Sequence, residues 1–406
     1  MSHNKLIYAA AAMLLCASCS ENDSDFNLSD DSATPYEADI RRIYIDDQSI
    51  LKVHSDTILD VYKSNIVIRS ADDADLSNVV LRFKLTSGAT IYAINGDQQY
   101  TPCDDLALDY TDGQSHTFMV QSQNNQSHKL YTIAFSSVGL PVEHIDGKAI
   151  SSFHLESFAL NSEIKVPHYY EWEERNEAGE TLMTWCSANG GFGIAKSNSD
   201  AMDYPTYPCE GIEEGTYGVA LTTRSTGAIA AMMNMRLAAG NFFIGDFNIV
   251  TALRAPREST HFGVPHNYKP IKFSGYMSYQ AGESYQDEDG NIIDYPDSCD
   301  IYTILYRNYD DEGNAYHLDG DNVGDSPYIV AKARIPAELR AGTDGVWTRF
   351  EIDYDYDYPL GFDQNVLDAY GYSLTIVASS STDGAFFRGA PGSTLKIDEL
   401  TIECEE

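Results

Sequence analysis

The chain has 406 residues, of which 62 are acidic and 26 are lysine or arginine, so its formal net charge at pH 7 is −36. Such a surface repels phosphate backbones, which argues against nucleic-acid binding. It also disfavours anionic lipid headgroups and polyanionic glycans, unless a local basic patch offsets it. The length exceeds what one compact core usually serves, and we expect two domains.

The first residues have the pattern of an export signal. Lys5 precedes a charge-free apolar run from Leu6 to Ala17, which is too short to span a bilayer but suits the core of a secretory signal. Small residues, Ala17 and Ser18, stand directly before Cys19. A cysteine at that place is typical of a bacterial lipoprotein, so we expect removal of residues 1–18 and acylation of Cys19. The alternative is an ordinary signal peptide that happens to be followed by a cysteine.

Residues 19–35 are rich in aspartate, glutamate, serine and asparagine and contain no basic side chain. This composition predicts a disordered tether between a lipid anchor and a folded body. Its acidic start resembles the export signal that sends lipoproteins of the Bacteroides group to the outer face of the outer membrane. The resemblance implies a protein held at the cell surface by its lipid alone.

The cysteines do not form a recognisable metal motif. Cys16 leaves with the signal and Cys19 carries the lipid, and the remaining cysteines are Cys103, Cys186, Cys209, Cys299 and Cys404. They form no CxxC pair and have no histidine pair beside them, so a zinc site is not expected. Their odd number leaves at least one thiol free. A bridge between Cys209 and Cys299, both in turn-like sequence, stays open.

Residues 36–138 show short strands separated by turns. The segment VVLRFKLT (Val79 to Thr86) alternates apolar and basic side chains, as a half-buried strand does. A hairpin is predicted around Asn124 and Asn125, which tolerate a positive φ. This pattern predicts a small β-sandwich. The stretch LTSGATIYAING resembles the immunoglobulin-like modules that precede the working domain in many Bacteroides surface lipoproteins.

Residues 140–406 are also rich in strands and have turn residues between them. From Val346 to Tyr356, apolar and aromatic residues including Phe350 and Tyr354 alternate with Trp347 and charged residues. One face of this strand is expected in a core and the other in water, as in an antiparallel sandwich. The pattern predicts a larger two-sheet sandwich of the jelly-roll type, so the whole chain is expected to be all-β.

Five segments of this region carry a family resemblance: LAAGNFFIGDF, PIKFSGYMSY, DSCDIYTIL, VWTRFEIDY and VASSSTDGAFFRGAPGSTLKIDEL. They resemble, in the same order, the putative carbohydrate metabolism domain of Bacteroides-type bacteria. The resemblance implies a jelly-roll fold similar to carbohydrate-binding modules on an exported lipoprotein. It supplies no established catalytic residues.

Aromatic and amide side chains are the candidate sugar-binding groups. Trp185 lies four residues before Asn189 in the glycine-rich sequence MTWCSANGGFG, and Tyr204 and Tyr207 lie in a proline-containing stretch. A stacking platform for a sugar ring is one interpretation, and a buried core tryptophan is the other. Trp347 is a further candidate. The segment GGFGIAK lacks the residues of a phosphate-binding loop and is predicted to be a loop between strands.

Metal and catalytic signals are weaker. Asp398 falls in line with apolar residues of the last predicted strand, and Glu156 would be its partner in a structural calcium site. A water-facing edge position is the alternative for Asp398, and no other cofactor is expected. The chain lacks the motifs of serine hydrolases and zinc proteases. A pair of glycosidase carboxylates cannot be recognised from sequence, because their separation in space defines them.

These observations lead to three functional hypotheses. The first is a non-catalytic, surface-anchored glycan-binding protein that captures polysaccharide or oligosaccharide for an outer-membrane importer. The second is a carbohydrate-active enzyme of the glycoside hydrolase kind. The third is a structural or adhesive cell-surface subunit.

Overall fold

The structure is a computed structural model. It describes residues 38–405, with gaps at 46, 52–56, 60–64, 71–73, 96–98, 103–105, 112–113, 137–139, 162–167, 176–178, 180, 197–198, 248–254 and 312–315. The predicted signal peptide, the lipidation site Cys19, the tether and Cys103 lie outside the described residues.

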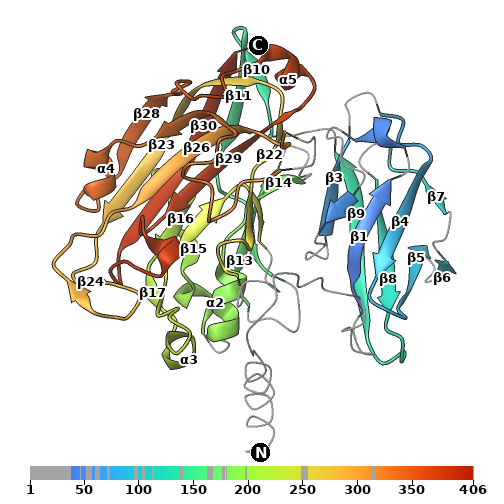
Figure 1. Cartoon of the computed structure of the whole chain (residues 1–406), viewed down its shortest axis with the longest axis horizontal. Coiled ribbons are helices and arrows are strands. Elements are labelled where there is room, and N and C mark those ends of the chain that lie inside the picture. The colour runs from blue at the N-terminus through green and yellow to red at the C-terminus, as the bar shows by residue number, and fades with distance from the viewer. Residues whose placement is uncertain are drawn as a thin grey trace, which may run out of the picture.

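The N-terminal part is a sandwich of two sheets, drawn in blue to teal in Figure 1. One sheet has the order β2-β1-β4-β7 and the other the order β3-β9-β8-β5-β6. Strands β3 and β9 run parallel, and the other described pairs are antiparallel. The elements are β1 (Ile40–Ile45), η2 (Gln48–Ile50), β2 (Thr57–Leu59), β3 (Asn65–Arg69), β4 (Val79–Leu85), β5 (Thr90–Asn95), β6 (Gln99–Pro102), β7 (Ala107–Leu108), β8 (Ser115–Gln121) and β9 (His128–Ser136).

Two local predictions for this part are confirmed. The segment VVLRFKL forms β4, in which Val79 and Leu81 are buried while Arg82 and Lys84 are exposed. Strands β8 and β9 form the predicted hairpin, and Asn125 in its turn has a φ of 58°. Asparagine adopts this left-handed conformation more readily than most residues, which is why the turn forms there.

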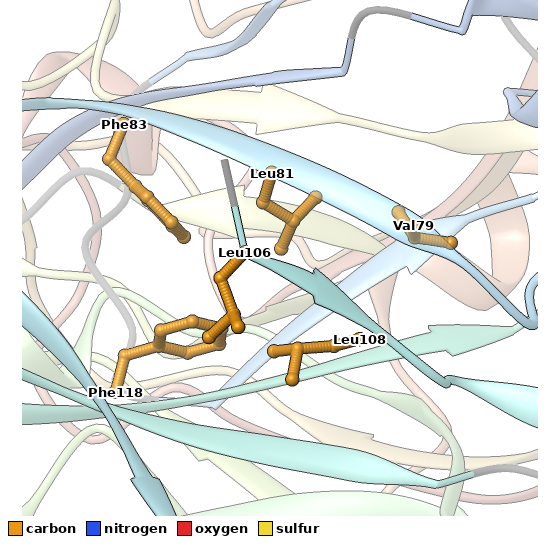
Figure 2. A pocket seen from close by; sticks show the side chains of 6 residues that line it. All are labelled: Val79, Leu81, Phe83, Leu106, Leu108 and Phe118. Atoms are coloured by element: carbon orange, nitrogen blue, oxygen red, sulfur yellow. The ribbon is translucent and has the colours of Figure 1, made fainter. Parts of the chain in front are cut away.

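Apolar side chains fill the space between these two sheets (Figure 2). Phe83 of β4 packs against Phe118 of β8, with 5.2 Å between ring centroids. The lining residues of the small pocket beside them are Val79, Leu81, Phe83, Leu106, Leu108 and Phe118. The pocket has no room for a water molecule, so it is part of the core and not a binding site.

The C-terminal part contains two larger antiparallel sheets, drawn from green to red in Figure 1. The seven-stranded sheet contains β10 (Glu143–Ile145), β11 (Lys148–Phe153), β15 (Thr206–Glu210), β16 (Tyr217–Thr222), β23 (Lys269–Gln280), β28 (Thr348–Asp353) and β30 (Thr394–Glu405). The five-stranded sheet contains β19 (Asn241–Phe243), β22 (Val264–His266), β26 (Asp300–Arg307), β27 (Ile329–Arg334) and β29 (Tyr372–Ser379).

Smaller elements complete this part. The short strands are β12 (Phe158–Leu160), β13 (Tyr170–Arg175), β14 (Thr181–Thr184), β17 (Arg224–Ser225), β18 (Leu237–Ala238), β20 (Gly245–Phe247), β21 (Thr260–Phe262), β24 (Tyr285–Gln286) and β25 (Ile292–Ile293). The helices and 3-10 turns are α2 (Asn189–Ala195), η4 (Ala201–Asp203), α3 (Ala228–Ala231), α4 (Ala337–Ala341), α5 (Gln364–Asp368) and η5 (Gly384–Phe386). Within the described ranges, no helix is long and apolar enough to cross a membrane.

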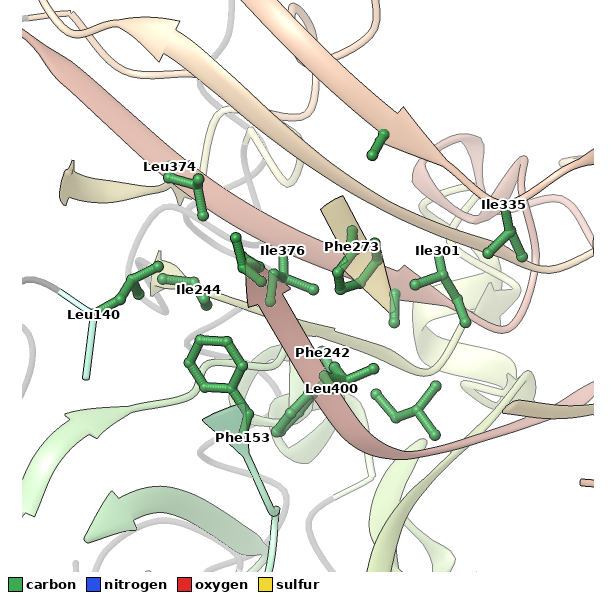
Figure 3. Close-up of a cluster of buried hydrophobic side chains, with 14 of the residues drawn as sticks. Leu140, Phe153, Phe242, Ile244, Phe273, Ile301, Ile335, Leu374, Ile376 and Leu400 are labelled. Carbon is green, nitrogen blue, oxygen red and sulfur yellow. The ribbon is translucent and has the colours of Figure 1, made fainter. Parts of the chain in front are cut away.

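One apolar core lies between the two sheets (Figure 3). Phe153, Phe273 and Leu400 enter it from the seven-stranded sheet. Ile301 and Ile376 enter it from the five-stranded sheet. From β27 to β30 each successive strand belongs to the other sheet, as in a jelly roll. The predicted all-β architecture, a smaller immunoglobulin-like sandwich followed by a jelly-roll sandwich, is therefore confirmed.

The alternation predicted from Val346 to Tyr356 holds within β28 and just after it. Phe350 and Tyr354 are buried and Arg349 is exposed. Val346 was predicted to share the core face, but it precedes the strand and is 62% exposed. The pairing of β28 with β23 begins only at Thr348, so Val346 lies outside the paired part of the sheet.

The predicted glycine-rich loop GGFGIAK is wrong, because most of it forms helix α2. Its sequence has poor helix propensity, since glycine destabilises helices. Tertiary contacts compensate: Phe192 is buried against Tyr204, and the Asn189 side chain bonds to both main-chain groups of Thr206.

The disulfide between Cys209 and Cys299 that the sequence left open does not form in this structure. Cys209 lies on β15 of the seven-stranded sheet, whereas Cys299 directly precedes β26 of the other. Among the described residues, Cys186, Cys209, Cys299 and Cys404 form no disulfide.

Candidate functional site

Trp185 is a core residue and not part of an exposed stacking platform. Its side chain is 4% exposed and its ring stacks on Phe242, with 4.4 Å between centroids and 17° between planes. The edge of Phe153 completes the contact, and the indole Nε1 donates a hydrogen bond of 2.9 Å to Glu174. The segment after β14 turns inward because this position offers both an apolar pocket and an acceptor for the indole N–H.

The other members of the predicted platform also have structural roles. Tyr204 is fully buried against Tyr169 and Phe192. Asn189 is 2% exposed, and its amide is used by Thr206. A sugar ring cannot reach either side chain, so the prediction of a sugar-binding role for them is wrong.

Two candidates remain partly accessible. Tyr207 on β15 is half-buried; its hydroxyl bonds to Thr222 Oγ1 at 3.0 Å, and the Arg224 guanidinium lies 5.2 Å from its ring centroid. Trp347, directly before β28, is also half-buried. Tyr207 and Trp347 both lie on or beside strands of the seven-stranded sheet, but they do not form a cluster with Trp185.

Asp398 does not occupy a water-facing edge. It lies on β30, which pairs with β23 along one side and with β11 and β16 in succession along the other. Its carboxylate is 1% exposed and accepts hydrogen bonds from the main-chain N–H groups of Ile212 and Glu399. Burial raises the pKa of Asp398 to about 6, and the nearby charge of Glu156 contributes to the rise.

The predicted pairing of Glu156 with Asp398 in a calcium site stays a prediction. The two carboxylates share a neighbourhood, yet Glu156 accepts a 3.0 Å hydrogen bond from the Tyr217 N–H. Calcium takes six to eight oxygen ligands. In the described part of the chain, no group of three or more His, Cys, Asp or Glu side chains is arranged to hold a metal.

A different cluster of polar side chains lies on the outer face of the five-stranded sheet. Cross-strand register places Tyr302 of β26 beside Arg334 of β27, and Ile304 beside Lys332. Asp300 precedes Tyr302 on the same face, because side chains alternate along a strand. Tyr358, which follows β28 in sequence, is close enough to Arg334 for their charges to interact. We call Asp300, Tyr302, Lys332, Arg334 and Tyr358 the polar patch.

The rest of this sheet face is closed by chain segments packed over it. Tyr306 of β26 donates a hydrogen bond to the Phe262 carbonyl, and Phe262 packs edge-on against Phe243 at 5.1 Å. Leu318 is fully buried in the same apolar cluster. The polar patch lies on the part of the face beside this apolar cluster.

An ion pair organises the polar patch. Arg334 donates from Nε to Asp300 Oδ1 at 2.9 Å and from Nη2 to Oδ2 at 2.6 Å. The Asp300 side chain is 8% exposed, whereas that of Arg334 is 37% exposed. The hydrogen bonds to Asp300 raise the pKa of Arg334. This two-point bond fixes the guanidinium plane and leaves further N–H donors of Arg334 directed elsewhere.

Lys332 and the tyrosines supply polar groups that the protein does not use. The Lys332 ammonium lies 4.6 Å from the Tyr302 ring centroid. Among the residues that the structure describes, none accepts a hydrogen bond from this ammonium, and none bonds to the hydroxyls of Tyr302 and Tyr358. Three hydrogen-bonding groups without protein partners in one patch are suited to bind a polar ligand.

An exposed aromatic ring lies at the same end of the sheet. Ser379, the last residue of β29, pairs with Asp300, and η5 follows shortly after it. Phe386 of η5 is 49% exposed and the Arg257 guanidinium lies 5.0 Å from its ring centroid. Its free surface is suited to contact the apolar face of a sugar ring.

The sequence contained a signal for the polar patch. In YIVAKARI, Lys332 and Arg334 alternate with alanines in an otherwise apolar strand. In CDIYTIL, Asp300 and Tyr302 are separated by one apolar residue, so they share one face of the strand. Each pattern by itself indicates only a strand with one polar face. The register between β26 and β27 was required to bring the two together.

The fold of this chain is shared with known proteins. A family model described as "Putative carbohydrate metabolism domain" matches residues 154–403, and the chain belongs to this family. A search of curated proteins finds no match.

Two solved structures resemble the chain. One is a putative glycoside hydrolase from Bacteroides thetaiotaomicron VPI-5482, with 30% identity and a TM-score of 0.77, over 92% of this chain and 99% of that one. The other is a putative glycoside hydrolase from Bacteroides vulgatus ATCC 8482, with 34% identity and a TM-score of 0.56, over 62% of this chain and 97% of that one. The family resemblance found in the sequence is therefore confirmed.

Proposed function

We propose that the protein is a surface-anchored lipoprotein whose jelly-roll sandwich binds a polysaccharide or oligosaccharide at the polar patch. Cys19 would carry the lipid and place the protein on the outside of the outer membrane. Membership of a carbohydrate metabolism family supports a sugar ligand. The observation that carries the choice of site is the set of unused polar groups on Lys332, Tyr302 and Tyr358.

The sugar chemistry fits these groups. Sugar hydroxyls both donate and accept hydrogen bonds, so they can meet an ammonium, two phenols and the remaining guanidinium donors. The exposed ring of Phe386, at the same end of the sheet, adds an apolar surface for the face of a sugar ring. We expect capture for a neighbouring outer-membrane importer to be the cellular role, with genes for an importer and glycosidases beside the gene for this protein.

A glycan array with the full-length protein in detergent tests the proposal, followed by calorimetry on the best ligand. Replacing a main contact aromatic commonly costs about 2 kcal/mol of binding, so Tyr302→Ala should weaken binding by more than tenfold. Tyr295→Ala is the matched control, because Tyr295 is 57% exposed and lies outside the polar patch. Equal affinities of the two variants would place the site elsewhere.

A glycoside hydrolase is the second candidate, favoured by the descriptions of both solved relatives. A general acid with a raised pKa is one requirement of such an enzyme, and burial raises the pKa of Glu174 to about 7. Glu174 is 6% exposed and bonded to a core tryptophan, however, which keeps substrate away. Release of new reducing ends from the bound glycan would establish the enzyme and refute pure binding. Self-assembly without glycan binding would favour a structural or adhesive subunit.

A further inference from the structure

We propose that the polar patch selects an anionic sugar residue, with the Lys332 ammonium meeting its carboxylate or sulfate group. This inference rests on the proposed glycan-binding function and specifies the class of sugar. In the sequence, Lys332 has the pattern of an ordinary lysine on the polar face of a strand.

The surroundings of Lys332 are unusual for a lysine. Its stem leaves β27 and its ammonium lies over the ring of Tyr302, 4.6 Å from the centroid. Burial lowers the pKa of Lys332, and the positive charge of Arg334 lowers it further, whereas the smaller effect of Asp300 acts in the opposite direction. The net result is that a positive charge here is costly, and a bound anion would offset the cost.

The nearest carboxylates are already engaged. Both oxygens of Asp300 accept hydrogen bonds from Arg334. Asp355 pairs with Lys332 through the main chain, but its carboxylate accepts a hydrogen bond of 2.9 Å from the Asp357 N–H. No ion pair joins Lys332 to any acidic residue in the part of the chain that the structure describes. The patch therefore has two cations and one neutralised carboxylate.

Three other lysines of the same sandwich show the contrast. Lys148 bonds to Glu403 at 2.6 Å, Lys272 bonds to Glu351 at 2.7 Å, and Lys269 bonds to Glu405. In a chain with a net charge of −36, carboxylates are plentiful. The partly buried ammonium of Lys332 is not paired with any of these carboxylates among the described residues, so it forms a local basic site. Such a site would let this acidic protein bind an anion.

The donor set matches a carboxylate or a sulfate. The Lys332 ammonium provides a compact charge with three N–H donors, and Arg334 retains N–H donors beyond those given to Asp300. Charge-assisted hydrogen bonds of this kind are about twice as strong as neutral ones. A neutral sugar could use the same donors but would leave the charge of Lys332 uncompensated.

The test is a glycan array built from matched pairs. One arm carries oligogalacturonides and glucuronic-acid oligosaccharides beside their carboxyl-reduced neutral counterparts. A second arm carries sulfated and desulfated forms of one backbone, which separates the two sources of anion. We expect the full-length protein to bind one anionic form at least tenfold more tightly than its neutral partner, with affinity falling as salt rises.

Variants then assign the preference to one side chain. Lys332→Gln should lower affinity for the anionic glycan about tenfold and leave affinity for the neutral form nearly unchanged. Lys332→Arg should retain part of the preference. Lys396→Gln is the control, since it removes the same charge from a half-buried position on β30 of the other sheet. Thermal melting checks that each variant is folded.

The possible results test the anionic preference separately from glycan binding itself. Equal or tighter binding of the neutral partner, or an anionic preference that survives Lys332→Gln, refutes the role of Lys332 and leaves glycan binding standing. A protein that binds no member of either arm and no neutral glycan on the array refutes both.

Discussion

The indole of Trp185 and the ring of Phe242 lie nearly parallel, 4.4 Å apart, in the core of the jelly-roll sandwich. Trp185 directly follows β14 and Phe242 lies on β19, so the contact joins the end of the small three-stranded sheet to the five-stranded sheet. Loss of the indole would open a cavity and remove one of the hydrogen-bond donors to the Glu174 carboxyl.

Replacement of Trp185 by alanine is therefore expected to destabilise the fold by about 3–5 kcal/mol. Chemical denaturation followed by fluorescence or circular dichroism measures this free energy of unfolding. Trp347→Ala, at a half-buried position, should cost much less. A Trp185→Ala protein that melts like the wild type would contradict the core assignment.

Glu174 should make stability depend on pH. Burial raises its pKa from 4.5 to about 7 in the folded state. The folded protein thus binds this proton more tightly than the unfolded chain, and the stability so gained is present below about pH 4.5 and lost as the pH rises to about 7. The loss amounts to roughly 3 kcal/mol. The Glu174→Gln variant should gain stability relative to the wild type across this window.

The comparison must be made as variant minus wild type, because His266 acts in the opposite sense. Burial lowers the pKa of His266 from 6.5 to about 4, so its contribution is present above pH 6.5 and lost as the pH falls to about 4. The pH dependences that Glu174 and His266 give to the free energy of unfolding therefore partly cancel in the wild-type protein. Glu213→Gln, at an exposed turn, controls for the loss of one negative charge. A difference curve for Glu174→Gln that is flat with pH would refute the titration.

Gly240 is required by close packing of main chains. A Cβ atom there would lie 2.4 Å from the Thr222 nitrogen and 2.5 Å from the Pro205 carbonyl oxygen. Main-chain atoms cannot move aside like a flexible side chain, so Gly240→Ala should destabilise by at least about 1–3 kcal/mol. Gly324→Ala, where a Cβ would meet no atom within 4 Å, is the matched control. Similar melting temperatures for the two variants would show that the sheets can separate at Gly240.

Acylation of Cys19 remains to be tested in cells. Cys19→Ala should release the protein from the membrane fraction and change its apparent mass, since the thiol that carries the lipid is gone. Globomycin, which blocks lipoprotein signal cleavage, should cause the precursor of the unmodified protein to accumulate. Unchanged membrane association of Cys19→Ala would show that the Ala17-Ser18-Cys19 junction does not direct lipidation.

Much of the fold follows from local sequence alone. Alternation in VVLRFKL predicted β4, turn residues predicted the β8–β9 hairpin, and Phe350 marked the buried face of β28. These features depend on neighbours one or two positions apart, so the order of residues is enough to define them. The family resemblance likewise rested on short strand sequences that the sheets need.

The position of the site depended on long-range pairing. The sequence around Trp185 fits an exposed stacking tryptophan as well as a buried one. Trp185 is buried because Phe242 and Glu174, which lie in other segments of the chain, pack against it. α2 formed from a glycine-rich segment because Thr206 and Tyr204 hold it in place. The Asp300–Arg334 pair and Lys332 likewise come together through the register of β26 and β27. Burial and cross-strand contact are properties of the assembled sheets, which no stretch of neighbouring residues specifies.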